Sequence, residues 1–458
     1  MKLVLALLLA AASAFAQVRL PAYTKAVLPN GATILLLPRP GIPLVHFRVL
    51  IKGGVESDPQ QMAGLASITA AMLRRGTGKR SATQFAEELE FLGGTFNSAF
   101  DTPLGSATAI SSEFLKKDFD QGLDILADAI LHPAFSETEV RKNLAQAVDA
   151  VKATKDNPQA SITNYFRAAF YGQNHPYGNP MDGQSLTRIS RKDIVDYHAK
   201  LYCGKNITVV VAGDFDLATA KTKLAEAFGQ TPAGTPYVWR TVQPGTPKGR
   251  MVLVNKADAT QTYFQIGQPG VDKKSPDRTT LEVVNTLFGG RFTSMLNEEL
   301  RTNSGLTYGA NSQLSQERLP GAITISTYTK TDTTVAAIDL ALEVLKRFNE
   351  KGVTATQLAS AKAFVKGQYP TRHLETIDQL ATLIGNIELY ELGRDEVDGY
   401  FARIDGVTLE RANAAIRKYY QRENLTFVIL GAADKIRDAV NKYDAKPMEL
   451  STKDAGWQ

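Results

Sequence analysis

Short apolar runs alternate with helical patterns along this chain, and their order is the same in its two halves. Runs of alternating polarity that are rich in β-branched residues indicate strands, whereas apolar positions that recur with helical periodicity indicate helices. The first half has strand patterns at 32–37, 45–51, 92–110 and 207–212, with helical patterns at 62–73 and 116–131. The second half has strand patterns at 250–254, 261–267, 308–314, 322–328 and 425–430, with helical patterns at 279–287, 293–302 and 335–348.

The grouping of strands with pairs of helices predicts an α+β fold, in which antiparallel or mixed sheets carry helices on one face. Because one order of elements occurs twice, we expect two homologous α/β-sandwich lobes that arose by duplication. A stretch rich in proline and glycine at 231–249 predicts the linker between them. The predicted lobes are residues 17–230 and 250–447, and residues 448–458 form a tail.

The N-terminus has the pattern of a cleaved export signal. Lys2 precedes an apolar run at 3–12, and Ala-Phe-Ala at 14–16 fits a cleavage site made of small residues. A single membrane anchor is the alternative, but the run is too short to span a bilayer. We therefore predict a signal peptide at 1–16, a periplasmic or secreted protein, and no transmembrane segment in the mature chain.

The composition is that of an ordinary globular protein. Of the 458 residues, 43% are hydrophobic and 22% are charged. The net charge of +5 arises from 52 basic and 47 acidic residues that are dispersed along the chain, which gives little support to nucleic-acid binding. The single cysteine, Cys203, cannot form an internal disulfide and is expected to be a small buried hydrophobic residue.

Several short motifs follow one another in a fixed order along the two halves. They are Leu28-Pro29-Asn30-Gly31, Gly53-Gly54-Val55, His175-Pro176-Tyr177-Gly178-Asn179-Pro180, Gly289-Gly290-Arg291-Phe292 and Gly305-Leu306-Thr307-Tyr308-Gly309. In this order, over nearly all of the mature chain, the sequence resembles the pitrilysin-like or insulysin-like zinc metallopeptidases, whose relatives include mitochondrial processing peptidase. The resemblance implies two similar lobes that form half of a clamshell, inside which extended peptides are held.

The zinc motif of the active family members, His-x-x-Glu-His on a helix, is absent from this chain. In that motif the two histidines bind Zn²⁺ from one helical face, and the glutamate acts as the general base. In the matching stretch, 64–77, the ligand positions are Ser67 and Ala71, and the base position is Ala70. The more distant glutamate ligand of the family falls near 147–150, which holds an aspartate but no glutamate.

The histidines of the chain do not offer a substitute site. No two of them are three or four residues apart, and each is expected to be a packed or capping residue: His46, His132, His175, His198 and His373. We therefore expect this chain to bind no metal and to have no peptidase activity alone.

Arg301 and Tyr308 match a pair that the family carries in its second half. There, an arginine and a tyrosine at this spacing contact the carbonyl oxygen of the peptide at or beside the cleaved bond, and the resemblance implies the same for this pair. A guanidinium and a phenol hydroxyl are suitable donors to the negative charge that develops on this oxygen. The structural alternative is a solvated Arg301 beside Glu298 and Glu299, with Tyr308 as an ordinary strand aromatic.

Some bacterial members of the family consist of two homologous subunits, one with the zinc motif and the other with the Arg/Tyr pair. The resemblance therefore predicts that this chain is the second kind of subunit in a heterodimer, with zinc on its partner and peptides as substrates. The segment Asn97, Ser98 and Ala99 is similar to the edge strand to which peptides add in the family. A non-catalytic scaffold and a peptide-binding protein of the same fold are the alternatives.

Overall fold

The computed structural model describes residues 18–102, 104–242, 250–444 and 446–458. The predicted signal peptide at 1–16 lies outside the described residues, as does the C-terminal part of the predicted linker. The part of the linker that is described, 231–242, forms neither helix nor strand. None of the helices in the described ranges has the length and apolar character needed to cross a membrane.

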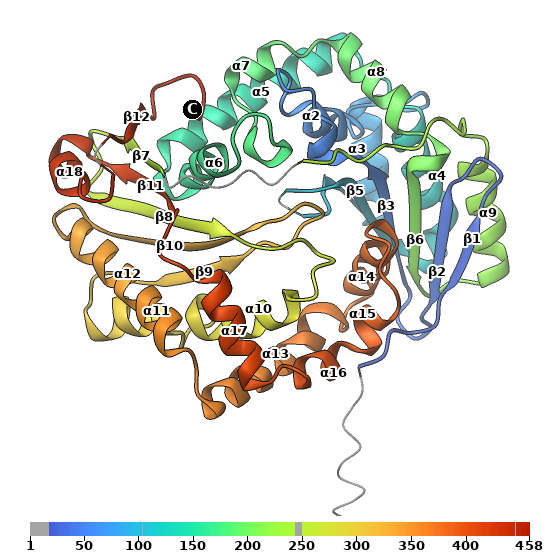
Figure 1. The fold of residues 1–458 in the computed structure, drawn as a ribbon. Coiled ribbons are helices and arrows are strands. Elements are labelled where there is room, and N and C mark those ends of the chain that lie inside the picture. The colour runs from blue at the N-terminus through green and yellow to red at the C-terminus, as the bar shows by residue number, and fades with distance from the viewer. Residues whose placement is uncertain (1–17, 103, 243–249, 445) are drawn as a thin grey trace, which may run out of the picture.

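The chain folds into two lobes, each built on a six-stranded mixed sheet (Figure 1). The first sheet has the strand order β1-β2-β6-β3-β5-β4. Within it β2 and β6 are parallel, β3 is antiparallel to both β6 and β5, and β4 pairs antiparallel with β5 at the edge. Its strands are β1 (Thr24–Val27), β2 (Thr33–Pro38), β3 (Leu44–Lys52), β4 (Thr95–Phe100), β5 (Ala107–Leu115) and β6 (Ile207–Gly213).

The second sheet has the strand order β12-β7-β11-β8-β10-β9, and its inner strands repeat the arrangement of the first. Strands β7 and β11 are parallel, and β8, β10 and β9 follow in antiparallel order. The outer strand differs, because β12 is parallel to β7 whereas β1 is antiparallel to β2. This repetition confirms the predicted α+β class with two similar lobes. The strands are β7 (Arg250–Asn255), β8 (Gln261–Pro269), β9 (Ala310–Leu314), β10 (Ala322–Lys330), β11 (Thr426–Gly431) and β12 (Met448–Ser451).

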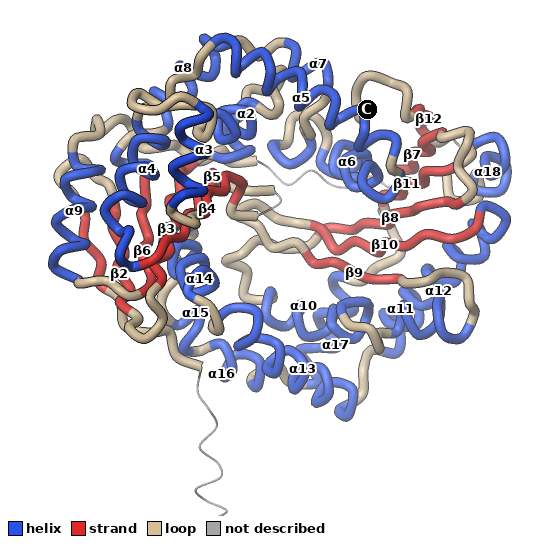
Figure 2. Tube along the Cα trace, turned by 180° about the vertical axis from the view of Figure 1, so that it is seen from behind, coloured by secondary structure: helices blue, strands red, loops and turns tan. Residues whose placement is uncertain are grey.

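Helices surround both sheets, as Figure 2 shows. Many begin at a serine, threonine, aspartate or asparagine whose side chain accepts a backbone N–H of the first turn, which is the usual N-cap. In the first half they are α2 (Leu65–Met72), α3 (Ala82–Phe91), α4 (Phe119–Leu131), α5 (Glu137–Asp156), α6 (Pro158–Tyr171), α7 (Gly183–Thr187), α8 (Arg191–Leu201) and α9 (Leu217–Gly229). In the second half they are α10 (Arg278–Asn285), α11 (Met295–Asn297), α12 (Thr334–Lys351), α13 (Ala355–His373), α14 (Ile377–Leu389), α15 (Asp395–Asp398), α16 (Tyr400–Asp405), α17 (Leu409–Tyr419) and α18 (Ala433–Val440).

Each sheet is also covered by a helix that belongs to the other half of the chain. Helix α14 packs across β3 and β6 of the first sheet, and helix α6 packs across β8 and β11 of the second (Figure 1). The central strands are consequently buried on both faces. Along β2, Ile34 and Leu36 belong to one hydrophobic core, whereas Leu35 and Leu37 belong to the other. Strands that are covered on both faces need continuous apolar runs rather than alternation, and the run at 32–37 has this character.

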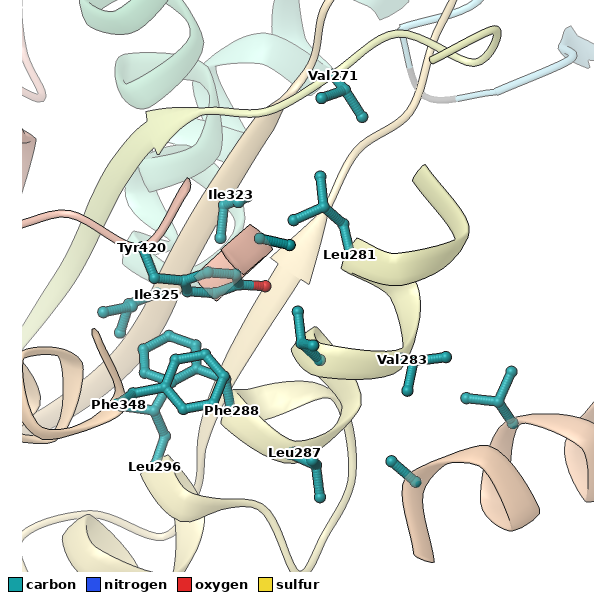
Figure 3. Close-up of a cluster of buried hydrophobic side chains, with 14 of the residues drawn as sticks. Val271, Leu281, Val283, Leu287, Phe288, Leu296, Ile323, Ile325, Phe348 and Tyr420 are labelled. Carbon is teal, nitrogen blue, oxygen red and sulfur yellow. The ribbon is translucent and has the colours of Figure 1, made fainter. Parts of the chain in front are cut away.

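An aromatic cluster forms part of the core of the second lobe (Figure 3). Phe288 stacks on Phe348 with ring centroids 4.9 Å apart, and Tyr420 meets both rings edge-on at 5.1 and 4.9 Å. The Tyr420 hydroxyl donates to Asn285 Oδ1 at 3.1 Å, so the buried polar atom of the cluster has a partner. Because Phe288 lies in the π-helical turn η5 (Thr286–Gly290), this cluster anchors the start of the segment that leads to Arg301.

The segment predicted as a tail, 448–458, is integrated into the fold. Its first four residues form β12, which pairs in parallel with β7 of the second sheet. The following residues reach the first lobe, where Trp457 is only 4% exposed and donates its indole N–H to the Met181 carbonyl oxygen at 2.9 Å. Lys155 of α5 donates to the carbonyl oxygens of Asp454 and Gly456. This segment therefore joins the two lobes.

A buried ion pair joins the two lobes at a second place. The Glu56 carboxylate is completely buried, and it accepts from Arg318 Nε at 3.0 and 2.9 Å and from Arg318 Nη2. Ser106 Oγ donates to the same carboxylate at 2.7 Å. The Arg318 guanidinium also lies over the Trp239 ring of the linker segment, 4.9 Å from its centroid. Glu56 thus has its charge compensated by a residue of the other lobe.

We expect Arg318→Ala to lower the free energy of unfolding by about 3–5 kcal/mol, because it leaves a buried carboxylate without its cation. Chemical denaturation measures this loss. The matched control is Arg437→Ala, which removes an Arg–Glu pair of similar geometry whose side chains are 38% and 44% exposed. The control should cost far less than Arg318→Ala, because both of its charges remain solvated. An equal loss of unfolding free energy in Arg318→Ala and Arg437→Ala would show that the buried pair stabilises the fold no more than an exposed one.

Candidate functional site

Helix α2 carries the residues that occupy the zinc-motif positions. It spans Leu65–Met72, so Ser67 and Ala71 are one turn apart on the same face, and both are partly exposed. Ala70, at the position of the general base, is buried, and its carbonyl oxygen accepts from Ser98 Oγ at 2.9 Å. A hydroxyl and two methyl groups cannot bind Zn²⁺ or accept a proton from water. The residues of this helix therefore do not fit the metal that the family resemblance implies.

The start of helix α2 is held by Asp58. Its carboxylate accepts the backbone N–H of Gly64 and of Ala66, both at 2.7 Å, and so satisfies two donors at the helix N-terminus. Gly64 has a φ of +100°, and a Cβ there would meet Met181 at 2.9 Å, which explains the glycine. Burial raises the pKa of Asp58 to about 7, although the two backbone N–H donors act in the opposite direction.

A cavity of about 190 Å³ lies beside α2. Ser67 lines it from α2 and Ala150 lines it from α5, so the cavity joins one degenerate ligand position to the region of the predicted distant ligand, 147–150. Arg167 of α6 also lines the cavity. Sequence reasoning did not single out Arg167, whose only signal is a charged residue within the otherwise apolar helical segment 165–170.

The part of the chain that the structure describes contains no group of three or more His, Cys, Asp or Glu side chains placed to hold a metal ion. The histidines have other surroundings. His198 lies 2.8 Å from the Ile130 carbonyl oxygen and stacks on Tyr202. His175 accepts the Tyr177 backbone N–H at 3.0 Å and caps a short helical turn. Burial lowers the pKa of His46, His175 and His198 to about 4 in each case, which keeps these rings neutral.

Arg301 and Tyr308 lie on either side of a loop that leads into the second sheet. Arg301 is in the π-helical turn η6 (Glu298–Asn303), and Tyr308 lies two residues before β9. The Arg301 guanidinium lies over the Phe292 ring, 4.6 Å from its centroid. Arg301 forms no ion pair with Glu298 or Glu299 among the described residues, and Glu299 instead pairs with Arg347 at 2.6 Å. This arrangement leaves the guanidinium donors available.

Tyr308 is not a strand residue, because β9 begins at Ala310, later than the predicted strand at 308–314. Its side chain is 82% exposed, and the neighbouring Phe292 is 72% exposed. Asn297 holds the loop from inside: its Nδ2 donates to the Phe292 carbonyl oxygen at 2.7 Å, and its Oδ1 accepts the Ala310 N–H at 3.2 Å. Tyr308 is therefore presented at the surface by a loop whose backbone is fixed, and Arg301 lies half-buried in the helical turn that precedes this loop.

The predicted edge segment, Asn97, Ser98 and Ala99, lies in β4 at the margin of the first sheet (Figure 2). These residues pair with Ser111, Ile110 and Ala109 of β5, respectively. No strand of the described chain pairs with the other edge of β4, so its backbone groups could pair with an added strand. Packing within the first lobe explains the glycine at position 94, because a Cβ on Gly94 would clash with the Phe114 ring.

The chain is similar to known protein families and to individual relatives. Residues 34–184 match the family described as insulinase (peptidase family M16), and residues 188–365 match the one described as peptidase M16 inactive domain. The uncharacterized zinc protease YmxG of Bacillus subtilis is 25% identical over 86% of this chain and 95% of its own length. The non-peptidase homolog YmxG of Helicobacter pylori is 24% identical over 86% of this chain and 90% of its own length.

Two solved structures share the fold. The peptidase M16 inactive domain from Pseudomonas fluorescens superposes with a TM-score of 0.82 at 23% identity, over 90% of this chain and 98% of that one. The periplasmic protease PqqL from Escherichia coli has a TM-score of 0.73 at 16% identity, over 89% of this chain but only 45% of its own. These likenesses agree with the two-lobed architecture.

We expect the purified chain to bind no zinc, and zinc binding to appear when the missing ligands are restored. The variant Ser67→His/Ala70→Glu/Ala71→His places both histidines on the exposed face of α2, and adding Ala150→Glu supplies a third ligand from the other side of the cavity. Isothermal titration with Zn²⁺ should show weak binding for the triple variant and tighter, one-to-one binding for the quadruple variant. About one zinc per chain in the unmodified protein would contradict the prediction that it binds no zinc.

The raised pKa of Asp58 predicts a pH dependence of stability. The folded chain binds a proton at Asp58 more readily than the unfolded chain does, so this group favours folding at low pH, and its contribution is lost as the pH rises to about 7. Asp58→Asn should flatten the decline in the free energy of unfolding between about pH 5 and about pH 7, by up to about 1.4 kcal/mol per pH unit. Denaturant unfolding at several pH values measures this difference. An unchanged slope in the variant would show that Asp58 does not titrate in this range.

Proposed function

We propose that this chain, which belongs to the insulinase family of peptidases (M16), is the subunit without a zinc site in a periplasmic heterodimeric peptidase. In this proposal a homologous partner carries the zinc motif, and Arg301 and Tyr308 complete its active site in trans. The observation that carries the proposal is the combination of two features in one chain. Helix α2 has lost the zinc ligands and the general base, whereas Tyr308 is exposed on a fixed loop and the half-buried Arg301 precedes that loop with its donors unpaired among the described residues.

The surroundings of Arg301 support a role that reaches outside the chain. A guanidinium that serves only the local structure usually pairs with a carboxylate. Glu299, two residues before Arg301, instead forms an ion pair with Arg347. Arg301 instead lies on the Phe292 ring, and this contact orients the guanidinium without using its N–H donors. Tyr308 presents its hydroxyl to solvent from the same loop. A peptide held between two subunits can meet both side chains.

The chemical role of the pair follows from the charge that amide hydrolysis creates. Attack on a peptide carbonyl places negative charge on its oxygen, and fixed N–H and O–H donors stabilise that charge. Arg301 supplies a delocalised cation with several donors, and Tyr308 supplies a neutral hydroxyl. The partner would supply the zinc, the water and the general base, which this chain lacks.

The length of a related structure supports pairing with a second chain. This chain spans only 45% of E. coli PqqL, so two chains of this size would account for the length of that protein. PqqL is described as a periplasmic protease. The signal pattern at 1–16 agrees with the same compartment for this chain.

A non-catalytic scaffold or peptide-binding protein is the second candidate. The observation that favours it is the similar Helicobacter pylori relative, which is described as a non-peptidase homolog. A scaffold would have no use for the unpaired donors of Arg301 and Tyr308, so substitution of these two residues separates the candidates.

The test mixes this chain with a homologous protein of the same organism that carries His-x-x-Glu-His, and follows cleavage of a quenched fluorescent peptide. We expect activity only in the mixture. Arg301→Ala and Tyr308→Phe should each lower kcat by about a hundredfold to a thousandfold, because each removes a donor to the developing oxyanion.

The matched control is Arg422→Ala, which replaces an exposed arginine in the loop between α17 and β11, apart in the sequence from the η6 turn and the loop with Tyr308. Its kcat should equal that of the unmodified mixture, and gel filtration should show that all variants still form the complex. Full activity of the Arg301 and Tyr308 variants in intact complexes would favour the scaffold.

A further inference from the structure

An arginine side chain lines the cavity beside the degenerate zinc motif, and the proposed function does not use it. Arg167 lies on α6, the helix that packs against the second sheet, and its side chain lines the cavity together with Ser67 and Asn164. The cavity is therefore not an apolar remnant of a lost site, since its wall offers a guanidinium, an amide and a hydroxyl.

Arg167 has no anionic partner in the part of the chain that the structure describes. Its Nε donates to the Tyr177 carbonyl oxygen at 3.0 Å, and no carboxylate of the described residues forms an ion pair with its guanidinium. Burial lowers the pKa of Arg167 to about 10, with Glu317 among the groups that act in the opposite direction. A half-buried guanidinium without a counter-ion is unfavourable, so the cavity favours an anion beside Arg167.

The other polar groups around the cavity are compatible with an anion. The Asn164 amide and the Ser67 hydroxyl have no hydrogen-bond partner among the described residues, and both can donate. Asp58 is the acidic group of the wall, and its two carboxylate oxygens are occupied by the backbone N–H groups of Gly64 and Ala66.

Apolar side chains from both lobes complete much of the wall, beside the polar Thr154 and Asn179. Val55, Phe100 and Met181 belong to the first lobe, whereas Trp457 arrives on the segment that follows β12. The Trp457 ring is fixed by its bond to the Met181 carbonyl oxygen, by an edge-on contact with Tyr165 at 5.0 Å, and by Lys155 4.8 Å above it. The cavity thus combines a cationic end with a rigid aromatic wall.

We propose that this cavity binds the C-terminal carboxylate of a peptide, with Arg167 as the anchor and the apolar wall receiving the last side chain. A carboxylate matches the planar fork of a guanidinium, whose Nη donors are available here. The volume of about 190 Å³ suits the end of one peptide rather than a whole folded partner. The site lies within this chain, so the inference holds whether or not a zinc-bearing partner exists.

The experiment measures binding of short N-acetylated peptides that end in leucine, as free acids and as C-terminal amides, to the isolated full chain by calorimetry. The free acid should bind about tenfold to a hundredfold more tightly than the amide, because only the acid forms an ion pair with Arg167. Arg167→Met should abolish this difference, and Arg167→Lys should retain part of it.

The control is Arg191→Met, which removes another arginine whose Nε donates to a backbone carbonyl oxygen, that of Phe135, away from the cavity. It should leave the preference for the free acid unchanged. The melting temperature of Arg167→Met should fall by no more than roughly 2–4 °C, because the lost hydrogen bond to the Tyr177 carbonyl oxygen is offset by removal of a cation without a counter-ion. A loss of folding would show that Arg167 serves the structure and would overturn the proposal.

Three further results would also overturn it. They are equal affinity for acid and amide, equal affinity for an amidated peptide that carries an internal aspartate, and displacement of the peptide by millimolar inorganic phosphate alone. The proposed heterodimer is tested by cleavage in the mixture, so failure of one proposal does not entail failure of the other.

Discussion

The fold depends on the exchange of helices between the two halves of the chain. Helix α14 covers β3 and β6, and helix α6 covers β8 and β11, so each sheet obtains one of its apolar layers from the other lobe. The central strands are apolar on both faces. Each sheet would therefore expose a large apolar surface without the helix from the other lobe. The Glu56–Arg318 pair and the segment around Trp457 cross the same boundary. The cavity and the loop with Arg301 are therefore parts of one packed body.

The sequence predicted the strands best where burial is most complete. The runs at 32–37, 207–212 and 425–430 lie within a residue or two of β2, β6 and β11, because strands that are covered on both faces are continuously apolar. It missed β12, whose four side chains are exposed or half-buried and so carry no apolar pattern. It also did not reveal the exchange of helices, because helical periodicity identifies an apolar face but not the sheet that this face will cover.

The candidate site, too, could be predicted from the sequence only in part. The residues Ser67, Ala70 and Ala71 follow directly from the motif, and their position on one short helix was predictable from it. The roles of Arg301 and Tyr308 rest on the family resemblance, and spacing alone could not reveal that Arg301 would lie on Phe292. Arg167 depends on contacts between elements far apart in the sequence, which no local pattern records.

The bridge made by residues 448–458 has a consequence for the biogenesis of the protein. Synthesis proceeds from the N-terminus, so strands β1 to β6 emerge well before α14 and Trp457, which complete their surroundings. During that interval the first sheet has an uncovered apolar face, and such nascent surfaces are prone to aggregation and are bound by chaperones. The first half of the chain therefore cannot complete its hydrophobic core until the end of the chain has been synthesised.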